Sequence, residues 1–423
     1  MSDASLVAYH RARTRPPYQK PGTVLLLMGA AAILFGVPTL YGTGALSITT
    51  VNQLGRFLAV VIAALGLDLV WGYAGILSLC QAMFFCLGGY AIGMHMALHG
   101  PLDGEGIPRC LFVVTSEVSG FHLPWFWQMF RSLPLAIVLG VALPGLLAYV
   151  FGYFTFRSRV RGVYFSIITQ ATTLAATLVF RMNNMHLCGT NGLTNFVTLA
   201  GWDLQSANVK LGLYILTAAM LVAVYLLCVG ISRSRLGRVL VAVRDNESRL
   251  RFAGFQPVSF KVFVFAFGAM AAALGGMLYT PQNGIITPFK MDADESILIV
   301  AAVAVGGRGT LSGAVVGSLT VSYLQSMLTS GVFYGWLPGF LKLPEGVVQP
   351  GFMGAVRADI KLMLGAQGWL FVLGMGFIVV TLFMPEGIVG LWRRIISGKA
   401  RGTSAAALPE TVKKPSSAVE VSA

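Results

Sequence analysis

Apolar stretches that are long enough to cross a lipid bilayer recur along this chain of 423 residues. A transmembrane helix needs about 20 predominantly apolar residues to span the hydrocarbon core. The stretch 57–99 contains a single Asp, Glu, Lys or Arg residue, Asp68, and is too long for one span. One globular core cannot bury this much apolar surface, so the sequence predicts a protein whose solvent is the membrane.

Composition and the placement of charge argue against a soluble nucleic-acid-binding protein. Hydrophobic residues make up 56% of the chain and charged residues 11%, whereas charged residues make up about 25% of a soluble domain. The net charge of +14 is strongly basic, but the Lys and Arg residues lie in short gaps between apolar runs. A nucleic-acid-binding protein presents them on a polar, soluble face. We therefore expect a lipid bilayer around the chain and no nucleic acid partner.

We expect an all-α, polytopic membrane protein with about ten transmembrane helices and a broken or re-entrant segment. The apolar segments that predict these helices are 23–41, 47–69, 82–98, 132–156, 162–180, 211–231, 261–280, 295–306, 311–329 and 368–384. The first half of 295–328 has barely enough residues to cross a bilayer, so this segment is either a short span or a re-entrant pair. A transmembrane domain then covers 23–392, between an N-terminal tail at 1–22 and a C-terminal tail at 393–423. The C-terminal tail is rich in Ala, Ser, Lys and Pro, a composition typical of disorder.

The distribution of Lys and Arg predicts the orientation of the chain. The connections 157–161 and 233–261 together contain ten Lys and Arg residues. Cytoplasmic loops of membrane proteins carry such an excess. Both connections, and with them both termini, are therefore predicted to be cytoplasmic.

The stretch 57–99 is predicted to break at 71–81. Gly72 and Gly75 each weaken a helix by about 1 kcal/mol relative to alanine, and backbone groups freed by a break cannot face lipid. They need protein or a watery cavity as a partner, so we expect the break to line a translocation pathway. The residues assigned to this pathway are Asp68, Tyr73, Gly75, Ser78, Gln81, Phe84 and Phe85.

The side chains of this set have different expected roles. Tyr73, Ser78 and Gln81 offer hydrogen-bond donors and acceptors to a neutral solute, and the two phenylalanines either close the path or pack in the ordinary way. Asp68 lies just before the break, so it either contacts the solute or binds backbone N–H groups near the helix end.

The connection 233–261 carries a mixed charge run that is suited to docking on another protein. A short amphipathic helix at about 239–253 would place Val243, Leu250 and Ala253 near one face and most charged groups elsewhere. The alternative is an ordinary positively charged cytoplasmic loop. The residues assigned to coupling with a partner are Arg244, Asp245, Asn246 and Glu247.

The loop 185–196 is predicted on the external side, where it forms either part of an entrance or a plain surface turn. It combines hydrogen-bonding side chains with turn-forming glycine. The same topology places Cys110 and Cys188 outside, which allows a disulfide between them in an oxidising compartment. The residues assigned to the external entrance are Asn191, Gly192, Thr194 and Asn195.

Signatures of catalysis and of cofactor binding are absent from the sequence. It contains no Walker A loop, no H-E-x-x-H, no G-x-S-x-G and no dinucleotide fingerprint. The five cysteines are scattered without a C-x-x-C pair, so we expect no metal and no cofactor. Ion-coupled transport needs ionisable groups within the spans, and Asp68 alone is thin support for it. We therefore expect a transport subunit that is not an enzyme and takes its energy from elsewhere.

Four ordered motifs resemble those of permeases in the branched-chain amino acid ABC importer family. They are G-Y-A-G-I-L-S-L-C-Q-A-M-F-F-C-L-G-G-Y-A at 72–91, S-R-L-G-R-V-L-V-A-V-R-D-N-E at 234–247, A-V-G-G-R-G-T-L-S-G-A-V-V-G at 304–317 and L-F-M-P-E-G-I-V-G-L at 382–391. The resemblance covers about 46–392. The family commonly has Gly-His where this chain has Cys80 and Gln81, so no role of that histidine is transferred.

Within the family, the chain most resembles the larger, LivM-like permease of the urea-transporting branch. This resemblance rests on F-V-V-T-S-E-V-S-G at 112–120, R-G-V-Y-F-S-I-I-T-Q-A at 161–171 and C-G-T-N-G-L-T-N-F at 188–196. It implies urea or a related small amide as the substrate. Branched-chain amino acids are the alternative substrate.

The family resemblance also implies partners and a location. The expected partners are a second, homologous permease subunit, two cytoplasmic ATPase subunits and a periplasmic solute-binding protein. The chain would form half of a pore in the bacterial inner membrane, without binding or hydrolysing ATP itself. A passive channel for small neutral solutes and a purely structural membrane subunit are the alternatives from other classes.

Overall fold

The computed structural model describes residues 29, 32–102, 107–111, 123–160, 162–329, 374–375 and 387–390. Within this part of the chain, seven helices are long and apolar enough to cross a membrane. They are α4 (Ile48–Asp68) with its continuation to Tyr73, α5 (Gln81–Leu98), α8 (Leu133–Arg157), α9 (Val163–Arg181), α10 (Ala207–Arg233), α12 (Pro257–Asn283) and α14 (Leu311–Thr329). These helices confirm the predicted all-α, multi-pass architecture.

Shorter elements connect the long helices. In chain order they are η1 (Ala32–Gly36), α3 (Val37–Gly42), η2 (Leu69–Tyr73), α7 (Trp125–Gln128), η3 (Asn183–Met185), η4 (Gly189–Asn191), β1 (Thr198–Leu199), β2 (Trp202–Asp203), α11 (Arg235–Phe252), η5 (Pro288–Met291) and α13 (Ala293–Gly306). The strands β1 and β2 form an antiparallel hairpin in which Leu199 lies opposite Trp202.

The described residues test only part of the predicted span list. The predicted span 295–306 corresponds to α13, which has 14 residues. Such a helix is about 21 Å long and does not cross a hydrocarbon core of about 30 Å. The predicted span 368–384 and the two tails lie outside the described residues, except Gly374 and Met375, and 23–41 lies there for about half its length. The total of ten spans and the side of the termini stay predictions.

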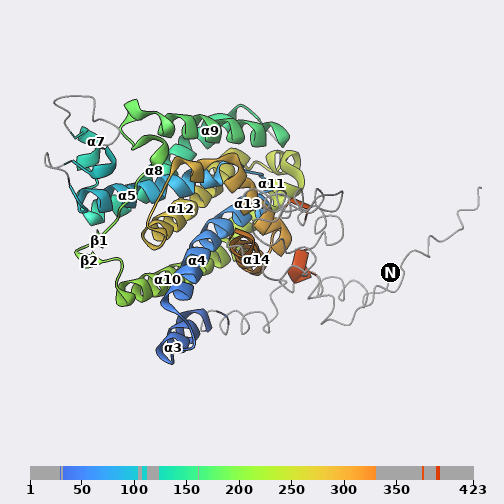
Figure 1. The fold of residues 1–423 in the computed structure, drawn as a ribbon. Coiled ribbons are helices and arrows are strands. Elements are labelled where there is room, and N and C mark those ends of the chain that lie inside the picture. Colours follow the sequence, from blue (N-terminus) through green and yellow to red (C-terminus); the bar gives the residue numbers. More distant parts are fainter. Residues whose placement is uncertain are drawn as a thin grey trace, which may run out of the picture.

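Helix α12 lies at the centre of the bundle, against α4, α5 and α8 (Figure 1). Glycine permits this packing, because a Cβ added at Gly276 would lie 1.7 Å from the carbonyl oxygen of Phe85. A Cβ at Gly88 would likewise lie 2.0 Å from the carbonyl oxygen of Ala273. Membrane helices approach this closely where small residues meet. Gly88 and Gly276 therefore allow α5 and α12 to pack backbone against backbone.

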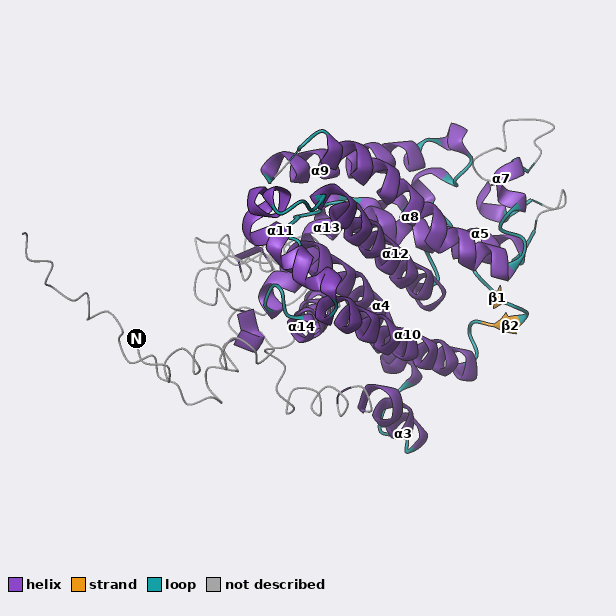
Figure 2. Ribbon diagram, turned by 180° about the vertical axis from the view of Figure 1, so that it is seen from behind, coloured by secondary structure: helices purple, strands orange, loops and turns teal. Residues whose placement is uncertain are grey.

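The two ends of the bundle carry different connections. The hairpin β1–β2 and helix α7 lie at one end, and α11 lies at the other (Figures 1 and 2). This separation agrees with the predicted topology, in which the loop 185–196 and the connection 233–261 are on opposite sides of the membrane. The excess of Lys and Arg in α11 predicts which of these ends is cytoplasmic.

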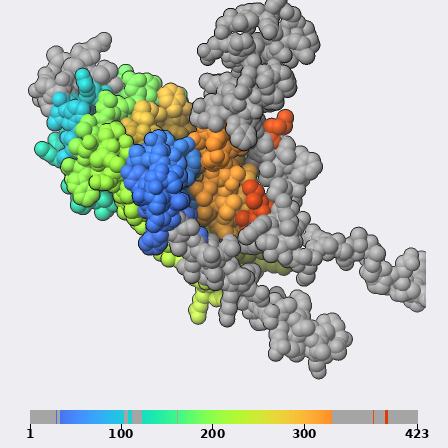
Figure 3. Space-filling model, turned by 60° about the horizontal axis from the view of Figure 1, so that its bottom comes forward, coloured from blue at the N-terminus to red at the C-terminus, as the bar shows by residue number. Residues whose placement is uncertain are grey.

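The outer helices expose apolar side chains along their length. Exposed residues of α8, α9 and α10 include Leu146, Ile167, Leu174, Leu216 and Leu226. Side chains of this kind on a membrane bundle face lipid, which cannot solvate polar groups. On another face, α4 (blue) lies beside α14 (orange), as Figure 3 shows.

Candidate transport site

The predicted break is present between α4 and α5. Helix α4 continues after Asp68 as the π-helical turn η2, and the chain is not helical at 74–80, before α5 begins at Gln81. Gly75 has a φ of +74°, a left-handed conformation that glycine adopts without steric cost. The sequence interpretation of 71–81 as a break is therefore confirmed in its position.

Side chains of α9 bind the backbone of the broken segment. The Ser166 hydroxyl donates to the carbonyl oxygen of Leu77 at 3.0 Å, and the Leu79 N–H donates to the Thr169 hydroxyl at 3.1 Å. The Thr173 hydroxyl donates to the carbonyl oxygen of Leu79 at 3.1 Å. These bonds supply the partners that a non-helical segment at membrane depth needs.

The sequence analysis missed this role of α9. The signal lies in the spacing of Ser166, Thr169, Thr173 and Thr177, which recur every three or four residues in an apolar span. That spacing puts all four on one helix face, and all four are buried. A polar stripe within a span therefore indicates a polar partner inside the bundle.

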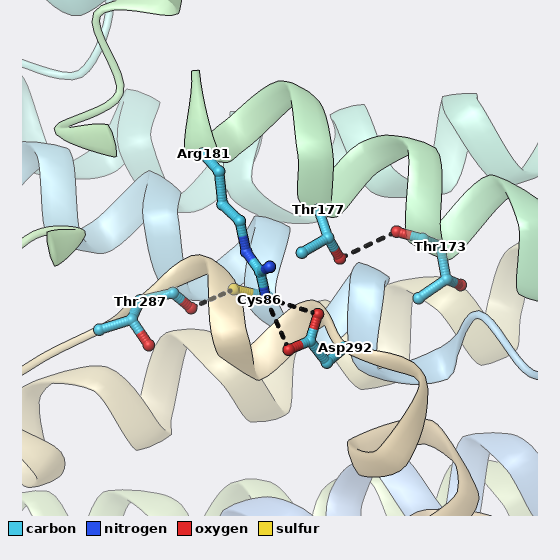
Figure 4. A network of polar contacts seen from close by, with 6 residues as sticks. All are labelled: Cys86, Thr173, Thr177, Arg181, Thr287 and Asp292. Carbon is cyan, nitrogen blue, oxygen red and sulfur yellow. Dashed lines mark hydrogen bonds and ion pairs between the residues drawn. The ribbon is translucent and has the colours of Figure 1, made fainter. Parts of the chain in front are cut away.

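An ion pair at the end of α9 joins this helix to the connection before α13 (Figure 4). The Arg181 guanidinium donates to both carboxylate oxygens of Asp292, at 3.0 and 2.8 Å, and lies 4.4 Å from the ring centre of Phe289. Nearby, the Cys86 thiol points to the Thr287 carbonyl oxygen at 3.5 Å. Helices α5 and α9 are thus both tied to 287–292.

Most of the predicted pathway residues are enclosed by protein. The Gln81 amide donates to the carbonyl oxygen of Gly268 at 2.8 Å, and the Ser78 hydroxyl lies 3.2 Å from the Cys80 sulfur. The ring of Phe84 meets that of Phe265 edge to face. Tyr73 is largely buried as well. Contact of these residues with a solute stays a prediction.

Asp68 is buried and joins the end of α4 to the turn between α13 and α14. Its carboxylate accepts a hydrogen bond of 2.7 Å from the N–H of Gly309. The neighbouring Arg308 guanidinium lies 4.9 Å from the ring centre of Trp71. A backbone partner near a helix end was one of the two expected roles of Asp68, although this N–H belongs to a distant turn.

A cavity of about 190 Å³, lined by apolar, polar and charged side chains, lies between α4, α5, α12, α13 and α14. Of the seven predicted pathway residues, Phe85 lines it. Its other lining residues are Arg56, Phe57, Val60, Ala82, Tyr279, Lys290, Glu295, Leu298, Ile299, Ala302, Val321, Ser322, Gln325, Ser326 and Thr329. The sequence analysis missed the three charged members, although Arg56 falls inside the predicted span 47–69.

Helix α11 contacts the break directly. The Arg244 guanidinium donates to the carbonyl oxygen of Gly72 at 2.8 Å, and a Cβ added at Gly75 would lie 2.7 Å from Cγ of Arg244. Asp245 beside it is exposed. One side chain of the predicted coupling set therefore reaches the end of α4.

Helix α11 is kinked at Asn246, whose φ and ψ are −159° and 91°. The kink separates Arg244 and Asp245 from Glu247, the last residue of the predicted coupling set. Glu247 turns inward, and its carboxylate accepts from Arg251 and Lys261, both at 2.8 Å. On the predicted apolar face, Val243 is buried, whereas Ala253, which lies beyond the kink, is exposed. The kink explains the difference, because residues beyond it no longer follow the period of the first half.

The predicted external loop is held against the chain beyond α12. Leu193 exchanges both backbone hydrogen bonds with Ile286, at 2.8 and 3.0 Å. Gly192 has a φ of +68°, and a Cβ there would lie 2.2 Å from the Ile286 carbonyl oxygen. Asn191 and Asn195 are exposed, and Thr194 is half-buried. The two amides are thus free to meet another molecule.

The two cysteines assigned to the external side lie in contact. The sulfur atoms of Cys110 and Cys188 are 2.6 Å apart. We expect them to form a disulfide in an oxidising periplasm. Mass spectrometry without reducing agent should detect a cross-linked peptide pair, and Cys228, buried in another part of the bundle, serves as the control thiol. Two unmodified thiols in protein taken from the membrane would contradict the expectation.

A multi-pass helical bundle with an interrupted span is typical of solute-transporting membrane proteins. The family model described as "Branched-chain amino acid transport system / permease component" matches residues 49–343. The chain belongs to this family and is a LivM-like permease of a bacterial inner membrane.

Relatives among known proteins are permeases of amino acid or sugar transport systems. The chain is 24% identical over 366 residues to the high-affinity branched-chain amino acid permease protein LivM of Salmonella typhimurium, with 81% of this chain and 77% of the relative covered. It is 20% identical over 252 residues to the ribose import permease protein RbsC of Haemophilus influenzae, with 58% and 74% covered. No solved structure matches the chain.

Proposed function

We propose that the chain is the membrane-spanning permease subunit of an ATP-driven ABC importer that carries urea, or a related small amide, into the cytoplasm. The observation that supports this most is the cavity between α4, α5, α12, α13 and α14, where polar and charged side chains in a largely apolar lining offer donors and acceptors to a small solute. The partners in this proposal are a second homologous permease, two ATPase subunits and a periplasmic solute-binding protein.

A second candidate substrate is a branched-chain amino acid. The LivM relatives carry that substrate in their names, and the cavity presents Lys290 and Glu295, whose opposite charges match a zwitterion. Urea remains the first candidate, because the three sequence motifs at 112–120, 161–171 and 188–196 resemble the urea-transporting branch. A passive channel is the third candidate.

The proposed coupling site is α11, with Arg244, Asp245 and Asn246 as its residues. Glu247, the fourth residue predicted from the sequence, is paired with Arg251 and Lys261 and is proposed to stabilise the helix instead. The exposed groups Asp245 and Asn246 would meet an ATPase subunit, and Arg244 would carry the movement to the break through the Gly72 carbonyl. A passive channel needs no such connection.

Uptake by the complete transporter tests the proposal. Cells that carry this chain with its partner subunits, and no other urea uptake route, should accumulate labelled urea, and deletion of this chain should abolish the accumulation. Labelled leucine in the same cells identifies the second candidate. A substitution of the ATP-binding lysine in the ATPase subunit should stop uptake of either solute, whereas persistent uptake in that variant would identify a passive channel.

A further inference from the structure

Two of the charged residues that line the cavity are paired with each other. The Lys290 ammonium lies 2.6 Å from a carboxylate oxygen of Glu295. Lys290 belongs to η5 and Glu295 to the first turn of α13, so the ion pair links the connection after α12 to the start of α13. The side chains are 30% and 28% exposed, and both line the cavity. Both side chains can therefore contact a solute in the cavity.

The surroundings of the pair are aromatic and polar. The Lys290 ammonium lies 5.8 Å from the ring centre of Tyr279, and this ring meets that of Phe85 edge to face at 5.4 Å. Arg56, the third charged lining residue, donates to the side-chain oxygen of Asn283 at 3.0 Å. The lining therefore has one net positive charge, and a cation is disfavoured there.

Each member of the pair keeps unused hydrogen-bonding capacity. A lysine ammonium has three donors, and a glutamate carboxylate has two acceptor oxygens. Among the described residues, the bond between Lys290 and Glu295 is the single hydrogen bond of either charged group. Two donors and one carboxylate oxygen are thus left for a solute.

We propose that Lys290 and Glu295 form the substrate-binding pair of the cavity and that they separate around a small neutral amide. The ammonium then donates to the amide carbonyl oxygen, and the carboxylate accepts the amide N–H groups. A carboxylate anion offers Glu295 no donor, and a guanidinium cation offers Lys290 no acceptor, so neither replaces the amide. This assignment rests on the proposed function, because it names the substrate contacts of the same cavity.

Urea uptake by the complete transporter, measured as KM and maximal rate, tests this assignment. Lys290→Met and Glu295→Gln are each expected to raise KM roughly ten- to a hundredfold, the effect of losing hydrogen bonds to a charged group. Lys290→Arg retains the ion pair but presents a different donor geometry, so it should also raise KM while the amount of protein in the membrane stays unchanged. Excess acetamide should compete with urea, and excess guanidinium or acetate should not.

The ion pair between Arg181 and Asp292 provides a matched control. It has a similar length of 2.8 Å and similar side-chain exposure, 30% and 32%, but neither residue lines the cavity. Asp292→Asn should therefore lower protein abundance at most and leave KM unchanged. If Lys290→Arg and Glu295→Gln transport urea with the wild-type KM, the pair is structural and the assignment is wrong. A wild-type transporter that takes up leucine and not urea overturns the neutral-amide assignment, whereas uptake of neither solute refutes the proposed function itself.

Discussion

Gly75→Leu is expected to abolish solute uptake while the protein remains in the membrane. Gly75 has a φ of +74°, and a Cβ there would lie 2.7 Å from Cγ of Arg244. The left-handed backbone costs a non-glycine residue about 1–2 kcal/mol, and the leucine side chain would push α11 away from the break. Uptake in cells, together with immunoblotting of the membrane fraction, measures both effects.

Gly284→Leu is the matched control for this substitution. Gly284 has a φ of +76°, but nothing lies within 4 Å of an added Cβ. Both variants therefore carry the same backbone strain, and only one disturbs the contact with α11. If the two variants lose uptake to the same degree, the loss comes from backbone strain and not from the contact with Arg244.

Arg244→Glu is expected to stop uptake while ATP hydrolysis by the assembled transporter continues. The substitution removes the 2.8 Å hydrogen bond to the Gly72 carbonyl and places a carboxylate beside that oxygen, which repels it. Helix α11 then loses its bond to the end of α4. Transport and hydrolysis measured together in proteoliposomes should show this uncoupling.

The variant Glu247→Lys is expected to destabilise the protein without affecting the coupling of transport to ATP hydrolysis. Glu247 binds Arg251 and Lys261, so a lysine there brings a third positive charge next to two others. We expect less protein in the membrane and, in the remaining protein, an unchanged ratio of transport to hydrolysis. If Arg244→Glu also shows a normal ratio of transport to hydrolysis, Arg244 has no role in coupling.

The sequence alone predicted those features that depend on local chemistry. The break at 71–81 follows from Gly72 and Gly75, and the structure places it at 74–80. The length of α13 was harder to interpret, because the predicted span 295–306 is apolar but barely long enough for a bilayer. An apolar segment is expected to be buried, either in protein or in lipid. Its composition therefore does not distinguish a helix of half the length from a full transmembrane span.

Tertiary contacts account for what the sequence analysis missed. A polar residue in a span needs a partner, but the sequence does not say which one. The amide of Gln81, for example, donates to the backbone of α12 at Gly268, a partner that the sequence does not indicate. Lys290 and Glu295 look like ordinary residues of a connection until the fold brings them beside Phe85 and Tyr279. Their proposed role depends on a cavity that α4 and α5 form together with α12, α13 and α14, two parts of the chain that are far apart in the sequence.

The bonds between α9 and the broken segment also constrain how the protein is made. Ser166, Thr169 and Thr173 follow their partners at Leu77 and Leu79 by 89 to 94 residues. Chains are synthesised from the N-terminus at about 5–20 residues per second, so the break waits roughly 5 to 20 s for α9 to emerge from the ribosome. During that interval lipid offers its backbone no partner, and the segment has to be sheltered by water or by the insertion machinery. The order of synthesis is therefore part of what this fold requires.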